Sequence, residues 1–296
     1  MLDMKRLQSR AAFFQAVRTF FDGQRFLEVD TPIRQPLVIP EQNISHIPSS
    51  GHFLQSSPEL YMKRLLAGGC EQIYQICHCF RQGERGRLHL EEFIMLEWYR
   101  RDADYKDLMR DCEALIRFLH TELPDHCFPF PLGQACEYVT VEEAFASYCS
   151  MSVQDALDQD LFDELLVEYI EPHLGKICPT FLYDYPLELA SLARQKEEHP
   201  EVAERFELYV SGVELGNGFS ELTDPEIQRS RFEEEYVNMG ILHASQKKMP
   251  EKFLASLARL EQAAGIAVGL DRLFMLFMGE KNLDAVVSFA PEQLDM

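Results

Sequence analysis

Phe93, Met95, Glu97 and Tyr99 occupy every second position of a short segment, so they share one face of a predicted strand. Together they offer a flat ring, a carboxylate and a phenol in line. A loop rich in arginine precedes this strand, and Arg81 stands where the loop begins. A ring and an arginine can hold a nucleotide, and a carboxylate beside a phenol can hold an amine. The pattern therefore predicts a site for both.

The segment before the loop alternates in the same way. Gln75, Cys77, Cys79 and Arg81 fall on one face of a second predicted strand. Cys77-His78-Cys79 is a tempting metal-binding triplet, but the alternation turns His78 away from both thiols. We therefore favour strand packing, and none of the eight cysteines has the spacing of a paired zinc site.

A hairpin with two acidic residues is predicted later, where two strand-like segments flank the turn Ser211-Gly212. A symmetric turn predicts two cross-strand pairs, Tyr209 with Glu214 and Glu207 with Gly216. The two glutamates then lie on one face as diagonal neighbours, roughly 7–8 Å apart at the backbone. Carboxylates at that separation could share a divalent cation, although such residues in isolation are more often sheet-surface carboxylates.

A strand of small residues runs into a helix near the end of the sequence. Residues 265–269 are small or β-branched, and residues 270–277 have the apolar spacing of a helix that ends before Gly279. Arg272 falls in the first turn of this helix, where the helix dipole favours an anion. An arginine there is mildly unfavourable unless a phosphate partner is nearby.

The remaining elements follow from apolar spacing and helix-start signals. Residues 6–24 predict an amphipathic helix with an apolar face of Leu7, Ala11, Phe14, Val17, Phe20 and Phe21. Further helices are predicted from Pro58 and over residues 106–119, 153–169 and 225–243, and residues 33–51 are predicted to be a loop.

Composition limits the class of protein. The 296 residues include 28 Lys and Arg against 49 Asp and Glu, which gives a formal net charge of −21. This charge argues against broad nonspecific binding of nucleic acid, because such binding depends on neutralising phosphates. A local cationic cluster can still bind an anion. Without a signal peptide or an apolar run of membrane length, we expect a cytoplasmic protein with reduced thiols and no membrane contact.

The motifs taken together resemble the class II aminoacyl-tRNA synthetases, in particular the lysine subgroup. Three segments match the three family motifs in order: residues 21–32, 80–99 and 265–272. Two more segments are similar to lysine-specific signatures, residues 57–65 and 214–224. The resemblance implies an α+β catalytic domain over residues 1–296, with an antiparallel sheet flanked by helices. It also implies a homodimer that pairs through residues 21–32.

Within this family the chain resembles the ligases that attach (R)-β-lysine to elongation factor P. The first-motif helix begins almost at residue 6, which leaves no room for the N-terminal anticodon-binding domain of lysyl-tRNA synthetases. The resemblance also implies glycine at position 267 in those synthetases and alanine, as in this chain, in the ligases.

The resemblance assigns a nucleotide site. Arg81 matches the arginine that holds the α-phosphate of ATP, and Arg272 matches the one near the γ-phosphate, so both are the predicted catalytic residues. The other predicted ATP-binding residues are Glu84, His89, Phe93, Glu214, Leu215 and Gly269. Glu207 and Glu214 match the carboxylates that hold Mg²⁺ against the phosphates.

The resemblance also assigns a site for (R)-β-lysine or lysine. The predicted substrate-binding residues are Ser57, Glu59, Glu97, Tyr99, Asn217, Glu221 and Ala267. Carboxylates are needed there because a buried ammonium without a partner would be costly.

Two positions depart from the family pattern. Gly83 stands where the second motif usually has glutamate, and Leu90 stands where relatives have asparagine. Two alternatives therefore stay open. One is a truncated synthetase that acts on L-lysine and tRNA or another acceptor, against which the acidic charge argues. The other is a non-catalytic regulatory paralogue.

Overall fold

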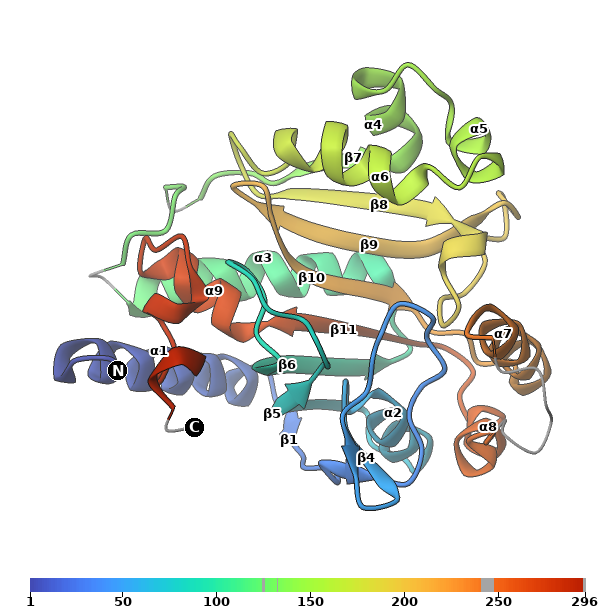
Figure 1. Cartoon of the computed structure of the whole chain (residues 1–296), viewed down its shortest axis with the longest axis horizontal. Helices are drawn as coiled ribbons and strands as arrows, with labels where there is room; N and C mark the ends of the chain where they lie inside the picture. The colour runs from blue at the N-terminus through green and yellow to red at the C-terminus, as the bar shows by residue number, and fades with distance from the viewer. Residues whose placement is uncertain (124–125, 132, 241–247, 295–296) are drawn as a thin grey trace.

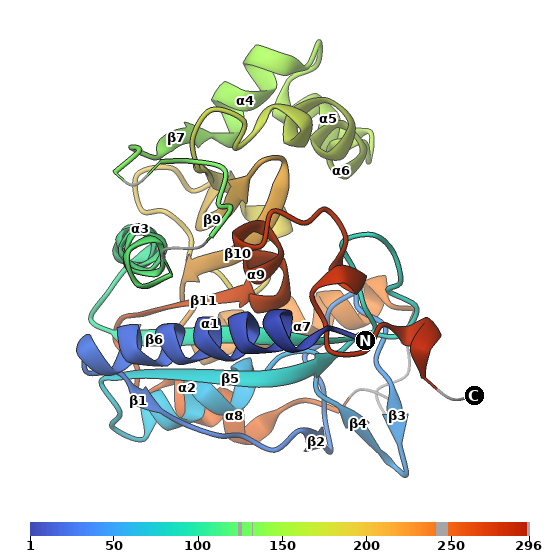
Figure 2. The same ribbon diagram turned by 90° about the vertical axis from the view of Figure 1, so that its left-hand side faces the viewer.

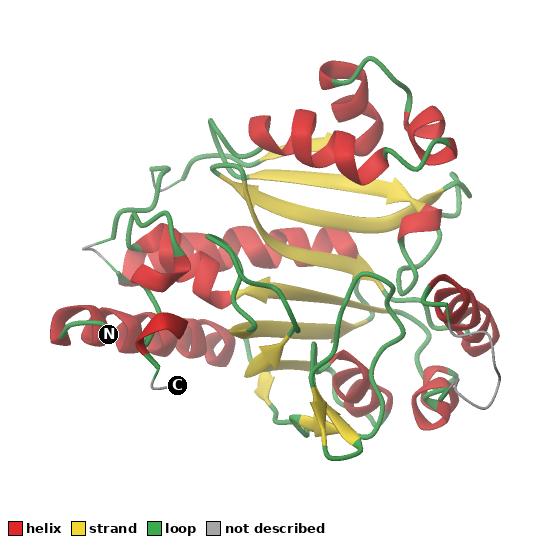
Figure 3. Ribbon diagram, viewed as in Figure 1, coloured by secondary structure: helices red, strands yellow, loops and turns green. Residues whose placement is uncertain are grey.

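A central sheet of eight strands organises the molecule. The computed structural model describes residues 1–123, 126–131, 133–240 and 248–294. The strand order is β1-β5-β6-β11-β10-β9-β8-β7 (Figure 1). The pairs inside the sheet are antiparallel, whereas β1 on β5 and β7 on β8 are parallel. Figure 3 shows helices on both sides of this sheet. The predicted α+β class is thus confirmed.

The strands of the large sheet are β1 (Leu27–Glu28), β5 (Gln72–Phe80), β6 (Glu92–Arg101), β7 (Glu137–Thr140), β8 (Thr180–Pro186), β9 (Val202–Val210), β10 (Val213–Ser220) and β11 (Ala263–Gly269). A small sheet has the order β2-β4-β3, with bounds Arg34–Gln35, His52–Leu54 and Pro48–Ser49 respectively. Residues 33–51 are otherwise mostly loop, as predicted.

Three helices cover one face of the sheet: α1 (Met4–Gly23), α3 (Tyr105–Glu122) and α9 (Leu270–Phe277). Figure 2 shows α1 running across β5 and β6, with α3 and α9 on the same side. Their apolar residues pack with one face of the strands into the main core. Within it Phe21 stacks on Tyr74 at 4.6 Å between ring centroids and lies 5.3 Å from Trp98. The side chains on the other face of these strands point away from this core.

The first helix is present where we predicted it, but its buried face differs. Asp3 caps it by accepting a hydrogen bond from the backbone N–H of Arg6 at 2.8 Å. The buried side chains are Phe13, Ala16, Val17, Phe20 and Phe21. Ala11 is exposed, and Leu7 and Phe14 are only partly buried. The buried stripe begins only at Phe13, whose ring lies 5.1 Å from Phe274 of α9, so the predicted packing of Leu7 and Ala11 on this face was wrong.

The other helices lie against the far face and the far edge. The helices α2 (Glu59–Ala67), α7 (Pro225–Asn238) and α8 (Glu251–Leu257) form a second core with the ends of β5, β6 and β11. The helices α4 (Val141–Tyr148), α5 (Val153–Asp158) and α6 (Phe162–Leu165) pack against β8.

The helix predicted over residues 153–169 is interrupted after Asp158, where Asp160 has a φ of +57°. Residues 241–243 of another predicted helix lie outside the described residues. The described part of the chain contains no helix that is both long and apolar enough to cross a membrane.

Candidate active site

The two strands that flank the arginine-rich loop share one functional face. Strand pairing sets Gln75 opposite Glu97, Cys77 opposite Met95, and Cys79 opposite Phe93. The intervening residues Tyr74, Leu96 and Trp98 belong to the main core on the other face. His78 is exposed while both neighbouring thiols are buried. The predicted alternation of both strands is therefore confirmed.

The acidic hairpin forms, but with an irregular register. Ser211 and Gly212 make the turn with φ values of +55° and +73°, and Tyr209 pairs with Glu214 as predicted. A bulge between Glu214 and Gly216 then shifts the pairing by one residue. Glu207 consequently pairs with Asn217, so the predicted pair of Glu207 and Gly216 was wrong.

This shift aligns polar residues across five strands. Glu207 pairs with Asn217, Asn217 with Ala267, Ala267 with Glu97, and Glu97 with Gln75. Side chains at directly paired positions lie on the same face of a sheet. The register therefore brings predicted metal-binding and substrate-binding residues from both halves of the chain into one row.

Glu97 is the centre of a buried hydrogen-bond cluster. Its Oε1 accepts a hydrogen bond from the Ser57 hydroxyl at 2.6 Å, and its Oε2 accepts one from the Tyr99 hydroxyl at 2.7 Å. The residue has no exposed surface. Burial and the neighbouring charge of Glu59 raise the pKa of Glu97 to about 8, although both hydrogen bonds oppose this. A cationic ligand beside this carboxylate would stabilise its ionised form.

Two more carboxylates adjoin this cluster. Glu59, on the first turn of α2, and Glu221, which directly follows β10, both form ion pairs with the ammonium of Lys63. Glu221 is 1% exposed, and its Oε1 has no hydrogen-bond partner among the described residues. Burial raises the pKa of Glu221 to about 8, although the charge of Lys63 opposes the rise. An unpaired buried carboxylate oxygen indicates a place for an ammonium group of a ligand.

Arg272 projects from the first turn of α9 over the end of the arginine-rich loop. Its Nε donates to the carbonyl oxygen of Leu88 at 3.0 Å, and its Nη1 donates to the carbonyl oxygen of Glu214 at 2.9 Å. Its Nη2 lies 2.8 Å from Nε2 of His89. Burial and the charge of Arg272 lower the pKa of His89, which keeps the imidazole neutral near pH 7. The structure thus brings Arg272, His89 and Glu214 together.

Arg81 lies on the other side of this space. Its guanidinium covers the ring of Phe93 at 5.3 Å, and its Nη1 is 3.8 Å from Glu84. Its buried Nε has no hydrogen-bond partner among the described residues. The pKa of Glu214 is raised by burial and by Glu207, while Arg272, Arg205 and Arg81 lower it. Both predicted phosphate-binding arginines therefore act on the charge of Glu214, as does Glu207.

The two predicted metal ligands differ in how free they are. The Oε2 atom of Glu207 accepts hydrogen bonds from Tyr185 at 2.6 Å and Tyr209 at 2.7 Å. Its Oε1 accepts one from Arg205 at 2.6 Å, so only one acceptor position on Oε1 stays open. Among the described residues, the Glu214 carboxylate makes one long contact, 3.4 Å to Arg272, and the side chain is 39% exposed. The pair fits Mg²⁺ with Glu214 as the accessible ligand.

The remaining predicted residues take different places. The side chain of Leu215 is in the main core, so only its backbone can reach a nucleotide. A Cβ at Gly269 would make only ordinary contacts, the nearest with Arg272 at 3.5 Å. Asn217 accepts a hydrogen bond from Arg205 at 3.2 Å. Gly83 has a φ of +80°, which a glutamate would rarely adopt, and Leu90 is buried in the main core.

Sequence reasoning missed several residues that line this site. Lys63 was visible only as part of a signature, although its spacing of four residues from Glu59 is that of a helical ion pair. Arg205 and Tyr185 gave no signal, because their roles depend on pairing between distant strands. Glu41 lies in the loop of residues 33–51, where burial and the charge of Glu59 raise its pKa to about 7.

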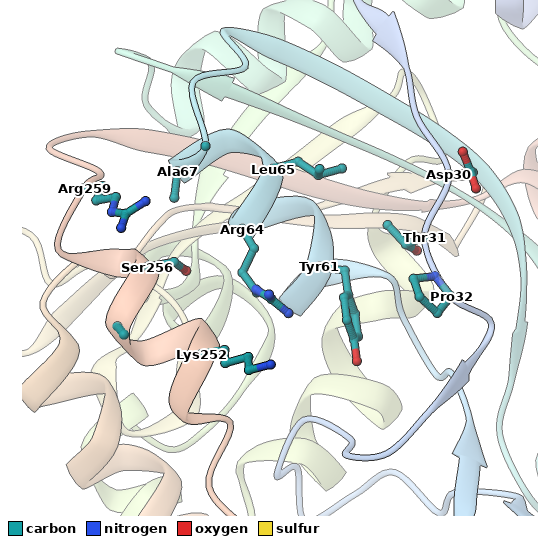
Figure 4. Close-up of a pocket in the computed structure, with 12 residues that line it drawn as sticks. Asp30, Thr31, Pro32, Tyr61, Arg64, Leu65, Ala67, Lys252, Ser256 and Arg259 are labelled. Carbon is teal, nitrogen blue, oxygen red and sulfur yellow. The ribbon is translucent and has the colours of Figure 1, made fainter.

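A separate cavity lies on the outer side of α2, away from the row of carboxylates. It has a volume of about 570 Å³ and is lined by α2, by α8 and by residues 30–32. Arg64 and Lys252 extend toward the same space (Figure 4). Glu59 and Lys63 occupy the opposite side of α2, so this cavity is not the amine site.

Comparison with known proteins agrees with the geometry. The chain matches the family described as "tRNA synthetases class II (D, K and N)" over residues 3–293. A Salmonella gallinarum protein named "Elongation factor P--(R)-beta-lysine ligase" is 35% identical, over 97% of this chain and 95% of that protein. A protein of the same name from Edwardsiella ictaluri is 36% identical over the same shares. The chain therefore belongs to the class II tRNA synthetases of the D, K and N type.

Proposed function

We propose that this chain is an ATP-dependent ligase that activates (R)-β-lysine as an adenylate and transfers it to a lysine ε-amine of elongation factor P. The proposal is carried by the buried carboxylate cluster of Glu59, Glu97 and Glu221, together with Arg81 and Arg272, the two arginines near Glu214. The cluster suits a substrate with ammonium groups, and the arginines suit the phosphates of ATP. The names of the relatives support the choice of amino acid and acceptor.

The first step forms the mixed anhydride. The carboxylate of the amino acid attacks the α-phosphorus of ATP, the bond to the β-phosphate oxygen breaks, and pyrophosphate leaves. Arg81 would hold the α-phosphate, where charge develops on the equatorial oxygens. Arg272 would hold the γ-phosphate, and Phe93 would stack on the adenine ring. Most of the rate then comes from alignment of the reacting atoms and from electrostatic stabilisation.

Divalent metal fits this arrangement. Glu214 and the open position of Glu207 Oε1 would hold Mg²⁺, which supplies positive charge to the phosphate oxygens when bound. Arg205 and the two tyrosines on Glu207 keep that carboxylate in place.

The second step transfers the amino acid. A neutral ε-amine of the acceptor lysine attacks the acyl carbon, a carbon–nitrogen bond forms, the carbon–oxygen bond to AMP breaks, and the amine loses a proton. No covalent intermediate with this chain is needed, because the adenylate is already reactive.

Substrate recognition would depend on charge. The ammonium groups of the amino acid would pair with Glu97 and with the free Oε1 of Glu221, and Tyr99 and Ser57 hold Glu97 in position. Charge-assisted hydrogen bonds of about 1.5–3 kcal/mol each would select against apolar analogues.

The test is ATP–pyrophosphate exchange with (R)-β-lysine, L-lysine or no amino acid, followed by transfer of radiolabel to elongation factor P or to tRNA. We expect exchange to be fastest with (R)-β-lysine and the label to appear on elongation factor P. If the folded protein shows no exchange with any of these amino acids, the result would instead favour the regulatory paralogue. Label on tRNA would favour the truncated synthetase.

We also propose that the catalytic domain forms a homodimer and works in the cytoplasm. Leu27 supports the dimer, because it is 57% exposed on β1, the strand at the edge of the large sheet. Sedimentation of the protein at micromolar concentration tests this.

A further inference from the structure

The amine cluster contains a cation of its own. Lys63 is completely buried, and its ammonium pairs with Glu59 from the same helix and with Glu221 from the end of β10. Its remaining surroundings are aromatic, with the rings of Phe219 and Phe253 at 5.1 Å and 5.9 Å. Burial would lower the pKa of Lys63, but the two carboxylates outweigh it and raise the pKa above its ordinary value. Lys63 is therefore charged.

Lys63 is also occupied on all sides. An ammonium has three donors, and here two of them face carboxylates while the aromatic rings close the rest of its surface. No surface of the residue is exposed, so it does not reach a substrate directly. Any effect on substrate must act through Glu59 and Glu221.

The ionisable groups that face this cation come from four segments. Glu59 on α2 and Glu221 after β10 pair with it, and Glu97 on β6 feels its charge; Tyr99 on β6 and Glu41 in the loop of residues 33–51 in turn interact with these carboxylates. The cluster of Glu59, Glu97 and Glu221 carries three negative charges when ionised, and Lys63 leaves a net charge of two.

We propose that Lys63 is a positioning residue that sets the charge of the amine pocket at two net negative charges when its three carboxylates are ionised, so that the pocket selects an amino acid with two ammonium groups. The inference deepens the proposed function and rests on it. By pairing with one oxygen of Glu221, Lys63 turns the other oxygen toward the ligand. By neutralising one charge, it weakens the hold of the carboxylates on protons that a ligand would have to displace.

The sign of the pH effect follows. Amines bind to ionised carboxylates, and the raised pKa values of Glu97 and Glu221, each about 8, mean that the empty pocket holds protons at pH 7. The kcat/KM for the amino acid therefore rises with pH up to this range. A nearby opposite charge typically lowers a carboxyl pKa by roughly 1–3 units, so its removal raises that pKa further.

The test is the pH profile of amino-acid-dependent ATP–pyrophosphate exchange in Lys63→Met. We expect the acid limb of kcat/KM to move to higher pH by about 1–2 units, with a 10- to 100-fold loss at pH 7. The kcat at saturating amino acid and high pH should fall much less. An acid limb that coincides with that of the wild type would overturn the proposal.

Two further variants separate charge from packing. Phe253→Leu disturbs the same contact between α2 and α8 without removing charge, so it should lower the melting temperature and leave the acid limb in place. Lys63→Arg keeps the charge, so the acid limb of its kcat/KM profile should lie within about 0.3 pH units of the wild-type limb. This shift is well below the effect of losing an ion pair. A limb displaced by a full unit in either variant would mean that packing, not charge, is responsible.

A measurement on the wild type keeps the proposal testable if Lys63→Met does not fold. Titration calorimetry compares L-lysine with 6-hydroxynorleucine, which has one ammonium group fewer. We expect binding to weaken at least 100-fold without the second ammonium; similar affinities would overturn the proposal. The exchange activity of the wild type with (R)-β-lysine tests the proposed function separately, so either idea can fail alone.

Discussion

Gly265 offers the sharpest test of the amine pocket, because one methyl group there would strike two of its walls. A Cβ at this position would lie 2.2 Å from Cε1 and 2.3 Å from Cδ1 of Tyr99, and 2.6 Å from Oε1 of Glu221. Both residues are buried, and the Tyr99 hydroxyl donates to Glu97 at 2.7 Å. In Gly265→Ala the ring and the carboxylate must therefore both shift.

The size of the effect follows from these contacts. Overpacking of a buried site costs roughly 1–3 kcal/mol. Part of this cost lowers stability, and part displaces groups proposed to bind the substrate. We expect kcat/KM for the amino acid to fall by about 10- to 100-fold, which corresponds to roughly 1.4–2.8 kcal/mol. The KM for ATP should stay within about twofold, well below the effect of losing one such contact.

Gly269→Ala is the matched control on the same strand. Its Cβ would meet only Arg272, at 3.5 Å, which is ordinary contact within the protein. We propose that the nucleotide lies close to Gly269, so this variant should raise the KM for ATP and spare the amino acid. Exchange assays with each substrate varied in turn measure both. If Gly265→Ala raised the KM for ATP as much as that for the amino acid, the proposed division of the site would be refuted.

Three other substitutions test further parts of the site. Ala267→Gly should improve the use of L-lysine relative to (R)-β-lysine by about 1–3 kcal/mol, measured as a ratio of kcat/KM values, because it removes one methyl from the row beside Glu97. Arg272→Lys should lower kcat/KM for ATP at least 10-fold, since a single ammonium cannot replace contacts made by three guanidinium nitrogens. Ligand-free wild-type protein should lose stability as pH rises from about 4.5 toward 8, because the folded state holds the proton of Glu97 longer than the unfolded state does. The slope from this one group is at most about 1.4 kcal/mol per pH unit, and chemical denaturation of Glu97→Gln between pH 5 and pH 8 should show its loss.

The parts of the fold that were predictable have strong local patterns. The strands β5 and β6 alternate over nine and ten residues, so period and face could be read directly. The helix over residues 270–277 could likewise be predicted from its apolar spacing. The face of α1 was less predictable, because every third or fourth position in this helix is apolar and the sheet covers only part of it. The break after Asp158 left no glycine or proline to mark it.

The site was predictable where family motifs carry it, and unpredictable where tertiary contacts do. Glu59 and Lys63 look in sequence like an exposed helical pair worth a few tenths of a kcal/mol. In the structure Glu221, which is 158 residues after Lys63 along the chain, pairs with the same ammonium, and all three residues are buried together. No local pattern reports that third partner, and so none reported the role of Lys63.

The bulge in the acidic hairpin shows how one residue changes the chemistry of the sheet. In a regular hairpin Gly216 would pair with Glu207, and Asn217 would face away from the site. The extra residue keeps Glu214 beside Tyr209, sends Leu215 into the main core, and turns Asn217 onto the face of Glu207. A Cβ at Gly216 would approach the carbonyl oxygen of Ala267 to 2.9 Å, so the close packing of β10 on β11 requires glycine at the bulge. The residues that we propose to bind metal and amine therefore share one continuous row only because the pairing shifts there.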